Sequence, residues 1–490
     1  MSMHEYDSMN PTARPADAPL ARAALIGFGA TVLLMYPGMM MWDSLDQFLQ
    51  ARSDWLSDWH PPVMSLVWRW LDRIVAGPFP MLALQCGLLW AGGYLLVRDA
   101  GPRSTAAKIC VLLLAFFFPP VLCVMGYIVK DALLAGLLMF SFGLASAMRC
   151  DPAAAPRRGW GHVAGIATLV VCLVLASAMR YNAIGAVWGA AAFAAYTLWP
   201  TTATLFRSLA AGAVLAVIST GIASNVNGIL TTPEKRSHPW KSVAAYDIAG
   251  VARRLGSMDF IPEDDLRLLA GDTPGGEWTI ERMQKGRHDW NHLLAAGVRV
   301  EASPALKKVW WNTVRNHPWD YLAHRLSAFG DNLRIGGEAK SQCLEMAALT
   351  GIWNYKEAEV PALLRHDYKL SPLQERVRYT MLWLARKTPL FYPGVYFLLA
   401  VCTMAWSLWA SRSGPTVPFF LAFSGFMQQA TLFFLCPAVN YRYSHWLVVS
   451  GWLAVLLVAA DAWVAVARRR RSQRSVAAAA GSTASVEATA

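Results

Sequence analysis

Residues 36–62 read YPGMMMWDSLDQFLQARSDWLSDWHPP and directly follow the first long apolar segment of the chain. The stretch mixes carboxylates with indole rings, namely Asp43, Asp46, Asp54 and Asp58 among Trp42, Trp55 and Trp59. Indole rings favour the headgroup level of a bilayer, so these acids are expected at a membrane surface, where a lipid phosphate would lie. The fold is therefore expected to be organised around this loop, which supplies the first candidates for a reactive acid.

The composition indicates an integral membrane protein. Of the 490 residues, 55% are hydrophobic and only 16% are charged, which is too apolar for a soluble protein of this length. The eight cysteines are scattered and mostly lie in apolar segments, so no disulfide framework is predicted. The net charge of +12 does not indicate nucleic acid, because basic residues crowd the short loops assigned to the cytoplasm.

About ten apolar segments approach the roughly 20 residues that a membrane helix needs. They lie near residues 21–41, 78–97, 109–129, 131–148, 162–179, 183–200, 207–226, 390–410, 416–436 and 443–467. The predicted fold class is an all-α polytopic membrane protein with both termini in the cytoplasm. Residues 60–76 (HPPVMSLVWRWLDRIVA) carry one apolar stripe with charges, which predicts an interfacial helix on the outer surface rather than a further span.

Five regions follow from this pattern. The predicted regions are a disordered cytoplasmic tail at 1–20 without a cleaved signal, a seven-span module at 21–226, a mainly helical outer domain at 227–388, three further spans within 389–467, and a basic, disordered cytoplasmic tail at 468–490. The outer domain contains a helical pattern from Leu306 to Phe329 and ends in an amphipathic segment, 371–387, that returns the chain to the bilayer.

Four residues of the outer loops are candidates for chemistry. Asp43 follows the first span in W-D-S-x-x-Q, and Asp131 opens the fourth span in Y-I-V-K-D. An acid at the end of a span is costly if it faces lipid, so both are expected to face the bundle interior or a wet cavity. A helix N-cap is the alternative for either residue. Asp58 and His60 form D-W-H-P-P, a candidate acid/base dyad or half of a metal site, with turn capping as the alternative.

A few basic residues lie at the outer ends of spans, although basic residues are expected mainly in the cytoplasmic loops. Their position therefore needs an explanation. Lys130, Arg180 in M-R-Y-N and Arg442 in N-Y-R-Y are expected to share an anionic ligand such as a phosphate, since arginine offers paired donors and lysine a point charge. Arg52 is the fourth such residue. Snorkelling toward the interface is the alternative for all four.

Two motifs of the outer domain are weaker. The segment 288–292, H-D-W-N-H, spaces two histidines by four residues, but it lacks the glutamate of the metalloprotease pattern, so it is a poor metal candidate. The segment 316–325, N-H-P-W-D-Y-L-A-H-R, is interpreted as a helix that docks the outer domain onto the membrane face. Walker, Rossmann, CxxC and nucleophile-elbow motifs are absent from the sequence, which disfavours nucleotide and redox chemistry.

This layout resembles the GT-C glycosyltransferases. The shared features are seven spans, an acid after the first span, an interfacial helix in the first outer loop, an acid in the second outer loop and a large outer domain before the eighth span. In plan the chain is most similar to the lipid A aminoarabinose transferases and the protein O-mannosyltransferases. Three features depart from the group: Asp43 is followed by Ser44 where an acidic pair is usual, the W-W-D signature is missing, and no recognisable sugar-binding repeat fills the outer domain.

The resemblance implies a function. A sugar on a polyprenyl phosphate would pass, with inversion, to a hydroxyl of a glycan, lipid or protein acceptor at the outer face of a bacterial inner membrane. Asp43 and Asp131 would serve as catalytic base or metal ligand, which leaves a divalent metal open and implies no other cofactor. Lys130, Arg180 and Arg442 would hold the lipid phosphate. The alternatives are a polysaccharide polymerase or ligase, a transporter or flippase of lipid-linked substrates, and an outer-domain assembly protein.

Overall fold

The computed structural model describes residues 18–102, 104–149, 159–199, 204–270, 278–285, 293–294, 296–298, 300, 303–335, 370–410 and 416–463. Within these ranges every regular element is a helix, and the extended backbone forms one isolated parallel bridge, between Met39 and Tyr127. The predicted all-α class is therefore confirmed. The C-terminal tail, the histidine pair of 288–292 and most of the N-terminal tail lie outside the described residues. Helix α1 begins at Ala18, within the predicted tail.

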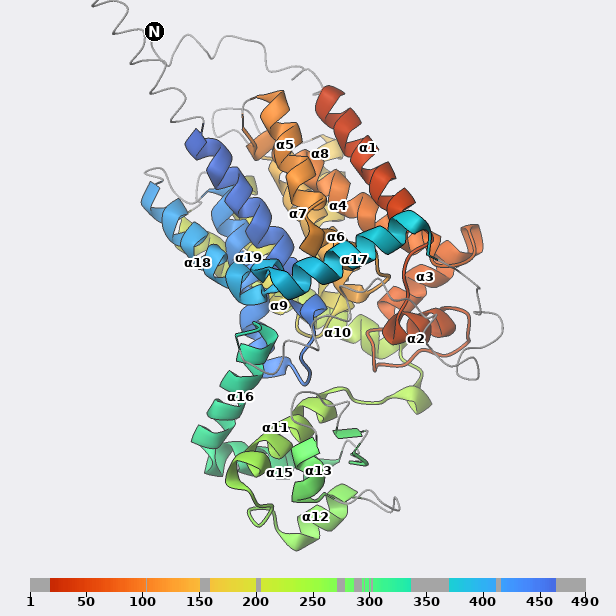
Figure 1. The fold of residues 1–490 in the computed structure, drawn as a ribbon, viewed down its shortest axis with the longest axis vertical. Coiled ribbons are helices and arrows are strands. Elements are labelled where there is room, and N and C mark those ends of the chain that lie inside the picture. Colours follow the sequence, from red (N-terminus) through yellow and green to blue (C-terminus); the bar gives the residue numbers. More distant parts are fainter. Residues whose placement is uncertain are drawn as a thin grey trace, which may run out of the picture.

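Eight described helices are long and apolar enough to cross a membrane. They are α1 (Ala18–Met35), α4 (Phe79–Ala100), α7 (Lys130–Ala147), α8 (Trp160–Met179), α10 (Leu205–Leu230), α18 (Pro393–Ala410), α19 (Val417–Leu435) and the last helix (Tyr441–Trp463). The chain is thus a multi-pass membrane protein, and these helices form the upper bundle of Figure 1.

Two of the predicted spans take another form. The segment predicted at 109–129 is broken into α5 (Thr105–Phe116) and α6 (Pro119–Met125), which are bent by 60°. The break falls just before Pro119 and Pro120, because proline cannot continue the preceding helix. The segment predicted at 183–200 is the 15-residue helix α9 (Ile184–Leu198), which is buried on most of its surface between α10 and α19.

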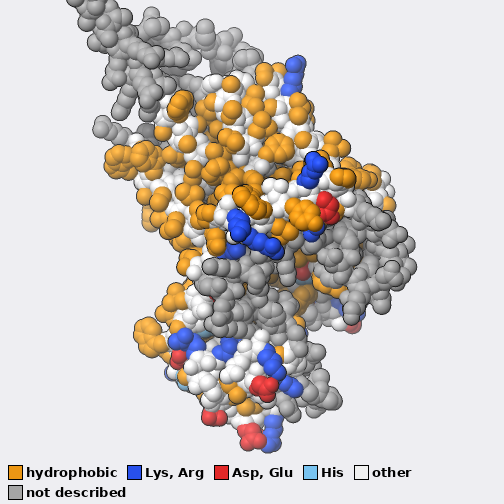
Figure 2. All heavy atoms as spheres, in the orientation of Figure 1, with side chains coloured by type: hydrophobic (Ala, Val, Ile, Leu, Met, Phe, Trp, Pro, Cys, Tyr) orange, Lys and Arg blue, Asp and Glu red, His pale blue; other side chains and the backbone are white. Residues whose placement is uncertain are grey.

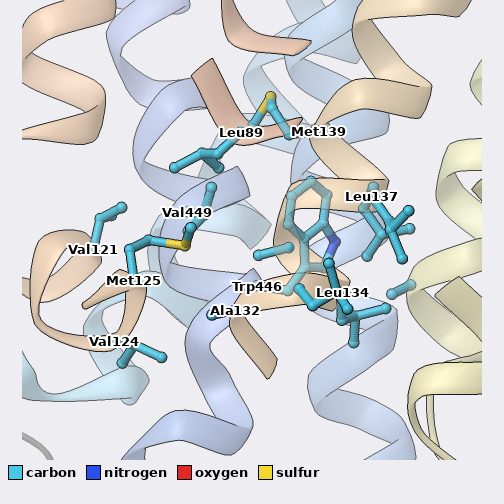
Figure 3. Packing of buried hydrophobic residues seen from close by; sticks show 14 of the residues in the cluster. Leu89, Val121, Val124, Met125, Ala132, Leu134, Leu137, Met139, Trp446 and Val449 are labelled. Carbon is cyan, nitrogen blue, oxygen red and sulfur yellow. The ribbon is translucent and has the colours of Figure 1, made fainter. Parts of the chain in front are cut away.

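The bundle core is close-packed where α4 meets α7. A side chain on Gly92 of α4 would collide with the backbone of Met139 and Phe140, and one on Gly143 of α7 would collide with the Gly92 carbonyl. Both glycines therefore let two backbones touch, as small residues do between membrane helices. Figure 3 shows the adjoining core, where Trp446 and Val449 of the last helix lie among Leu89 of α4, Met125 of α6 and Leu134 of α7.

A second hydrophobic core lies outside the bundle. It is formed by α11 (Trp240–Leu255), α12 (Glu263–Ala270), α13 (Ile280–Lys285), α15 (Pro304–Asn316) and α16 (Pro318–Asn332), which make the lower body of Figure 1. A short 3-10 turn, η1 (Pro233–Lys235), leads into it. The predicted helical pattern from Leu306 to Phe329 is divided into α15 and α16 at His317, which precedes Pro318.

Three shorter helices lie where the bundle meets the outer domain: α2 (Trp42–Ala51), α3 (Val63–Ile74) and α17 (Pro372–Lys387). Helix α17 crosses the bundle in Figure 1, and Gln374 near its start donates to the carbonyls of Leu34 and Tyr36 at 3.0 Å each. Figure 2 shows hydrophobic side chains over the bundle, with basic side chains gathered near the level of α17 and acidic ones more frequent on the lower body.

The charges of α3 hold α2 in place. At 12 residues α3 is too short to span a bilayer, in agreement with the predicted interfacial helix. Arg52 forms a two-point ion pair with Asp72 at 2.8 and 2.9 Å, so it is not available to a shared anionic ligand, and that suggestion from the sequence is corrected. Arg69 donates to the carbonyls of Gln50, Ala51 and Ser53 and thereby satisfies the C-terminal end of α2.

We expect Gly92→Ala to destabilise the protein, because the added methyl lies 2.4 Å from backbone atoms that cannot rotate away. Overpacking of this kind costs about 1–3 kcal/mol. Gly87→Ala in the same helix is the matched control, since its methyl meets only Phe28 at 3.7 Å. Thermal unfolding in detergent measures both variants, and equal unfolding temperatures would contradict the close α4–α7 contact.

Candidate functional site

Two outer loops are joined by their backbones, and this junction brings Asp43 toward α7. The amide of Met39 donates to the Gly126 carbonyl at 2.9 Å, and the amide of Ile128 donates to the Met39 carbonyl at 2.8 Å. Ser44 adds a side-chain bond from its hydroxyl to the Ile128 carbonyl at 2.5 Å. The start of α2 and the start of α7 are therefore held side by side. Ser44, which directly follows Asp43, thus has a structural task here.

A buried amide supports the same junction from inside the bundle. Gln85 of α4 donates through Nε2 to the carbonyls of Met125 and Tyr127, at 2.7 and 2.8 Å. These carbonyls lie between α6 and α7, where the helical ladder is interrupted and acceptors need other donors. Sequence reasoning missed Gln85, although a lone amide inside an apolar span is a signal for such a bond.

Asp43 lies among three basic side chains. Its Oδ2 atom accepts from Arg442 Nη2 at 2.6 Å and lies 3.9 Å from Lys130 Nζ, and its Oδ1 atom is 3.7 Å from His60 Nε2. Burial raises the pKa of Asp43, but the charges of Arg442 and Lys130, with the hydrogen bond from Arg442, outweigh burial and hold this pKa well below its usual range. The side chain is 21% exposed, so it is both ionised and reachable.

His60 contacts Lys130 rather than an acid. Lys130 Nζ lies 2.5 Å from His60 Nδ1. Burial, with the neighbouring Lys130 charge, lowers the pKa of His60 to about 3, so the imidazole is neutral at pH 7. With Nδ1 accepting from the ammonium, the proton of the neutral ring is on Nε2, which faces Asp43. In this tautomer His60 presents an N–H toward Asp43, and its other ring nitrogen is engaged by Lys130.

Asp131 forms the second acid–base pair of the site. It stands in the first turn of α7, is only 3% exposed and forms an ion pair with Arg180, which directly follows α8. Its other oxygen lies 3.9 Å from Nε of Arg442. Neither acid acts as a helix N-cap, since the N-cap positions of α2 and α7 are Met41 and Val129. Arg442 thus touches both carboxylates.

The two arginines of the site contact the same aromatic ring. The guanidinium carbons of Arg180 and Arg442 lie 4.4 and 5.5 Å from the ring centre of Tyr443, within the range of cation–π attraction. Tyr443 belongs to the N-Y-R-Y motif that was noted in the sequence, yet only the structure shows that its ring is shared by two cations.

Asp58 has a different partner from the one predicted. Its Oδ1 atom accepts from the amide and hydroxyl of Ser237 at 2.5 and 2.7 Å, and Oδ2 accepts from the amide of His238 at 3.2 Å. The predicted Asp58–His60 dyad is corrected accordingly, because both oxygens of Asp58 bind the segment that leads into the outer domain. The hydroxyl of Tyr181 also donates to the Asp58 carbonyl at 2.7 Å.

A cavity of about 740 Å³ lies between the bundle and the outer domain, and most of the site residues described above line it. Its charged end holds Asp43, His60, Lys130, Arg180 and Arg442. A second wall is apolar and runs from Leu432 to Ala438, at the end of α19. A third wall is aromatic and comes from Trp59, Trp240, Trp310 and Tyr321. The predicted cations therefore do meet the predicted acid in a single pocket.

A buried ion pair ties the outer domain to this cavity. Arg325 of α16, 1% exposed, binds Asp247 of α11 at 2.7 Å and donates to the carbonyl of Cys436 at 2.9 Å. Asp247 also accepts from the indole of Trp310 at 2.8 Å. The motif at 316–325 thus supplies a contact between the outer domain and the loop that precedes Arg442, in line with the docking interpretation.

The donor set does not fit a divalent cation. Asp43 and Asp131 each have an arginine partner, and Lys130 stands beside Asp43, so a metal ion would enter a site already rich in positive charge. Among the described residues, no group of three or more histidine, cysteine or acidic side chains is arranged to hold a metal. The two acids are therefore treated below as partners of cations.

No protein-family model and no curated protein matches the chain. Among solved structures, the chain is similar to ArnT from Cupriavidus metallidurans bound to undecaprenyl phosphate, with a TM-score of 0.33 and 12% identity over 89% of this chain and 77% of that one. It is also similar to the Archaeoglobus fulgidus oligosaccharyltransferase tethered to an acceptor peptide, with a TM-score of 0.35 and 12% identity over 90% of this chain and 49% of that one. This chain spans about half of the latter's length. These scores are too low to carry the functional argument, which depends on the side chains described above.

We expect Asp131→Asn to destabilise the protein strongly, because Arg180 keeps its charge and loses its buried partner. Breaking one member of such a pair costs about 3–5 kcal/mol. The double variant Asp131→Asn/Arg180→Gln should lose less than the two single variants together, as thermal unfolding of all four proteins in detergent would show. Strictly additive losses would contradict direct coupling of the two side chains.

Proposed function

We propose that the protein is a membrane glycosyltransferase that moves a sugar from a polyprenyl-phosphate donor to an acceptor hydroxyl at the outer face of the membrane. The observation that carries this proposal is the ionised Asp43 beside Arg442 and Lys130, in a cavity open between the bundle and the outer domain. All the charged groups of the site lie at one end of the spans, which favours chemistry at the membrane surface over passage through it.

The donor phosphate fits the cationic end of the cavity. Arg180 and Arg442 offer paired donors and Lys130 a point charge, the combination that binds phosphate oxygens. The adjoining wall at the end of α19 is apolar, and Phe434 and Leu435 are 59% and 45% exposed on it. A polyprenyl chain can lie along this wall while its phosphate reaches the cations, so the donor enters from the lipid side.

The reaction is a single displacement at the anomeric carbon. The acceptor oxygen forms a bond to this carbon, the bond from the carbon to the phosphate oxygen breaks with its electron pair going to the phosphate, and the hydroxyl proton passes to Asp43. General-base help of this kind contributes roughly 10²- to 10⁴-fold to the rate. Arg180, Arg442 and Lys130 stabilise the charge that grows on the leaving phosphate. One displacement inverts the anomeric configuration.

The neutral His60 orients the reacting groups. Its Nε2–H faces Asp43 at 3.7 Å, a separation into which an acceptor oxygen can insert as a bridge. The acceptor reaches this point from the aromatic wall, on the side of the outer domain. A glycan, a lipid or a protein hydroxyl fits this description, and a polysaccharide polymerase or ligase belongs to the same chemical class. The charge pattern of the loops favours cytoplasmic termini, and the proposal places the protein in a bacterial inner membrane.

We expect Asp43→Asn to lower transfer by at least about 100-fold, because the amide has the shape of the carboxylate but accepts no proton. Arg442 still lies 3.9 Å from Asp131 in this variant, so thermal unfolding should show that the protein stays folded. Asp54→Asn is the matched control: Asp54 lies in the same stretch, is exposed and is not part of the cavity wall. Release of polyprenyl phosphate from a panel of radiolabelled polyprenyl-phosphate sugars in proteoliposomes measures turnover. Wild-type activity in the Asp43 variant would remove Asp43 from the mechanism.

A further inference from the structure

The cations that would bind the donor phosphate are already engaged by carboxylates. Arg442 binds Asp43 at 2.6 Å, Lys130 lies 3.9 Å from the same oxygen, and Arg180 is paired with Asp131. A phosphate that enters the charged end must therefore compete with Asp43 for Arg442 and Lys130. Such competition means that the base and the leaving group are not independent.

The charges of this cluster can be compared with those of the ligands. Three cations, Lys130, Arg180 and Arg442, face two carboxylates, Asp43 and Asp131, so one positive charge is left over. His60 adds none, because its ring is neutral at pH 7. A polyprenyl-phosphate sugar is a diester with one negative charge and matches this excess. The polyprenyl phosphate left after transfer is a monoester that carries nearly two, about −1.5 to −2 at pH 7.

We propose that Arg442 and Lys130 pass from Asp43 to the phosphate as the sugar departs, and that Asp43 takes the acceptor's proton at this step because it is losing these partners. The inference rests on the proposed function and adds to it a coupling between the base and the leaving group. The proton that reaches Asp43 raises the positive excess of the cluster from one to two, as the phosphate gains its second negative charge. Charge inside the pocket stays balanced through the reaction.

The other groups around Asp43 are less suited to receive this proton. His60 already uses Nδ1 to accept from Lys130. Asp46, one turn further along α2, accepts from Gln50 at 2.7 Å and does not line the cavity. Tyr443 carries its own phenolic proton at neutral pH. When charged, Arg442 and Lys130 have hydrogen-bond donors but no acceptor that could take a proton. Asp43 is therefore the group whose proton affinity the phosphate changes most.

Binding of farnesyl phosphate, a monoester with the leaving group's chemistry, tests this coupling in the full-length protein in detergent. We expect Asp43→Asn to bind it about tenfold or more tightly than the wild type at pH 8, because the amide no longer competes for Arg442 and Lys130. As the pH falls toward 5 the gap should close, since Asp43 of the wild type can then be protonated in the complex. Both proteins see the same ionisation of the ligand, so the ratio of their Kd values isolates Asp43.

The matched control is Asp58→Asn, which removes the same charge from the same cavity. Because Asp58 binds Ser237 and His238 instead of the shared cations, no pH-dependent gap is expected. Arg442→Gln should weaken binding in either background, and thermal unfolding confirms that each variant is folded. An equal gain for Asp58→Asn would overturn the coupling, because the effect would then be general repulsion rather than exchange of partners.

Three further outcomes separate this inference from the proposed function. If farnesyl phosphate binds but Asp43→Asn binds it no more tightly than the wild type at any pH, the exchange is overturned while the phosphate site stands. If His60→Gln binds farnesyl phosphate more tightly than the wild type at pH 8 and Asp43→Asn does not, the acceptor's proton passes to His60 and the role given to Asp43 is overturned. If the wild type and all the variants fail to bind the ligand, the phosphate site itself falls, and the proposed function with it.

Discussion

The ion pair between Arg442 and Asp43 connects the two ends of the chain, since the residues are separated by almost the whole sequence. A carboxylate at the end of a membrane bundle needs an opposite charge within a few ångströms, and the arginine needs the acid for the same reason. Both are supported from behind: Asp43 by the backbone junction of Met39 with Tyr127, and Arg442 by the ring of Tyr443. The cavity, the outer domain and the loop after α19 are arranged around this pair.

The outer domain takes part in this arrangement through Arg325. Its guanidinium holds Asp247 inside the domain and the Cys436 carbonyl outside it, so one side chain connects two hydrophobic cores. Asp58 forms the opposite link, from the first outer loop to Ser237. Both links end on residues that line the cavity, Asp58 and Cys436, so they join the outer domain to the cavity wall at two points. A change in either link would therefore alter the cavity without touching Asp43.

The sequence predicted the elements better than it predicted their partners. Apolar length was sufficient to find eight of the ten predicted spans as long apolar helices, because the hydrocarbon thickness sets the length of each span separately. The sequence search also identified five charged residues at the outer ends of spans: Asp43, Asp131, Lys130, Arg180 and Arg442. An ionised group at the edge of a membrane is costly unless it has a partner or a function.

Which charged side chains bind each other depends on tertiary contacts that a local sequence pattern does not specify. Asp58 stands two residues from His60, yet it binds Ser237, and Arg52 stands near Asp43, yet it binds Asp72. The break between α5 and α6 did have a local signal, in Pro119 and Pro120. The end of α9 at Leu198 also had a local signal, in Pro200, because the residue before a proline disfavours the helical conformation.

Arg442 is placed so that movement toward a ligand affects both acids. It contacts Asp43 through Nη2 and approaches Asp131 through Nε, so its planar fork joins two carboxylates that would otherwise repel each other. A lysine at this position would offer one point charge and hold one of them. When the fork turns toward a phosphate, Asp131 keeps Arg180, whereas Asp43 keeps the neutral His60 and Lys130, and the phosphate also attracts Lys130. The asymmetry between the two acids therefore lies in their remaining partners, and the proposed coupling of base and leaving group depends on it.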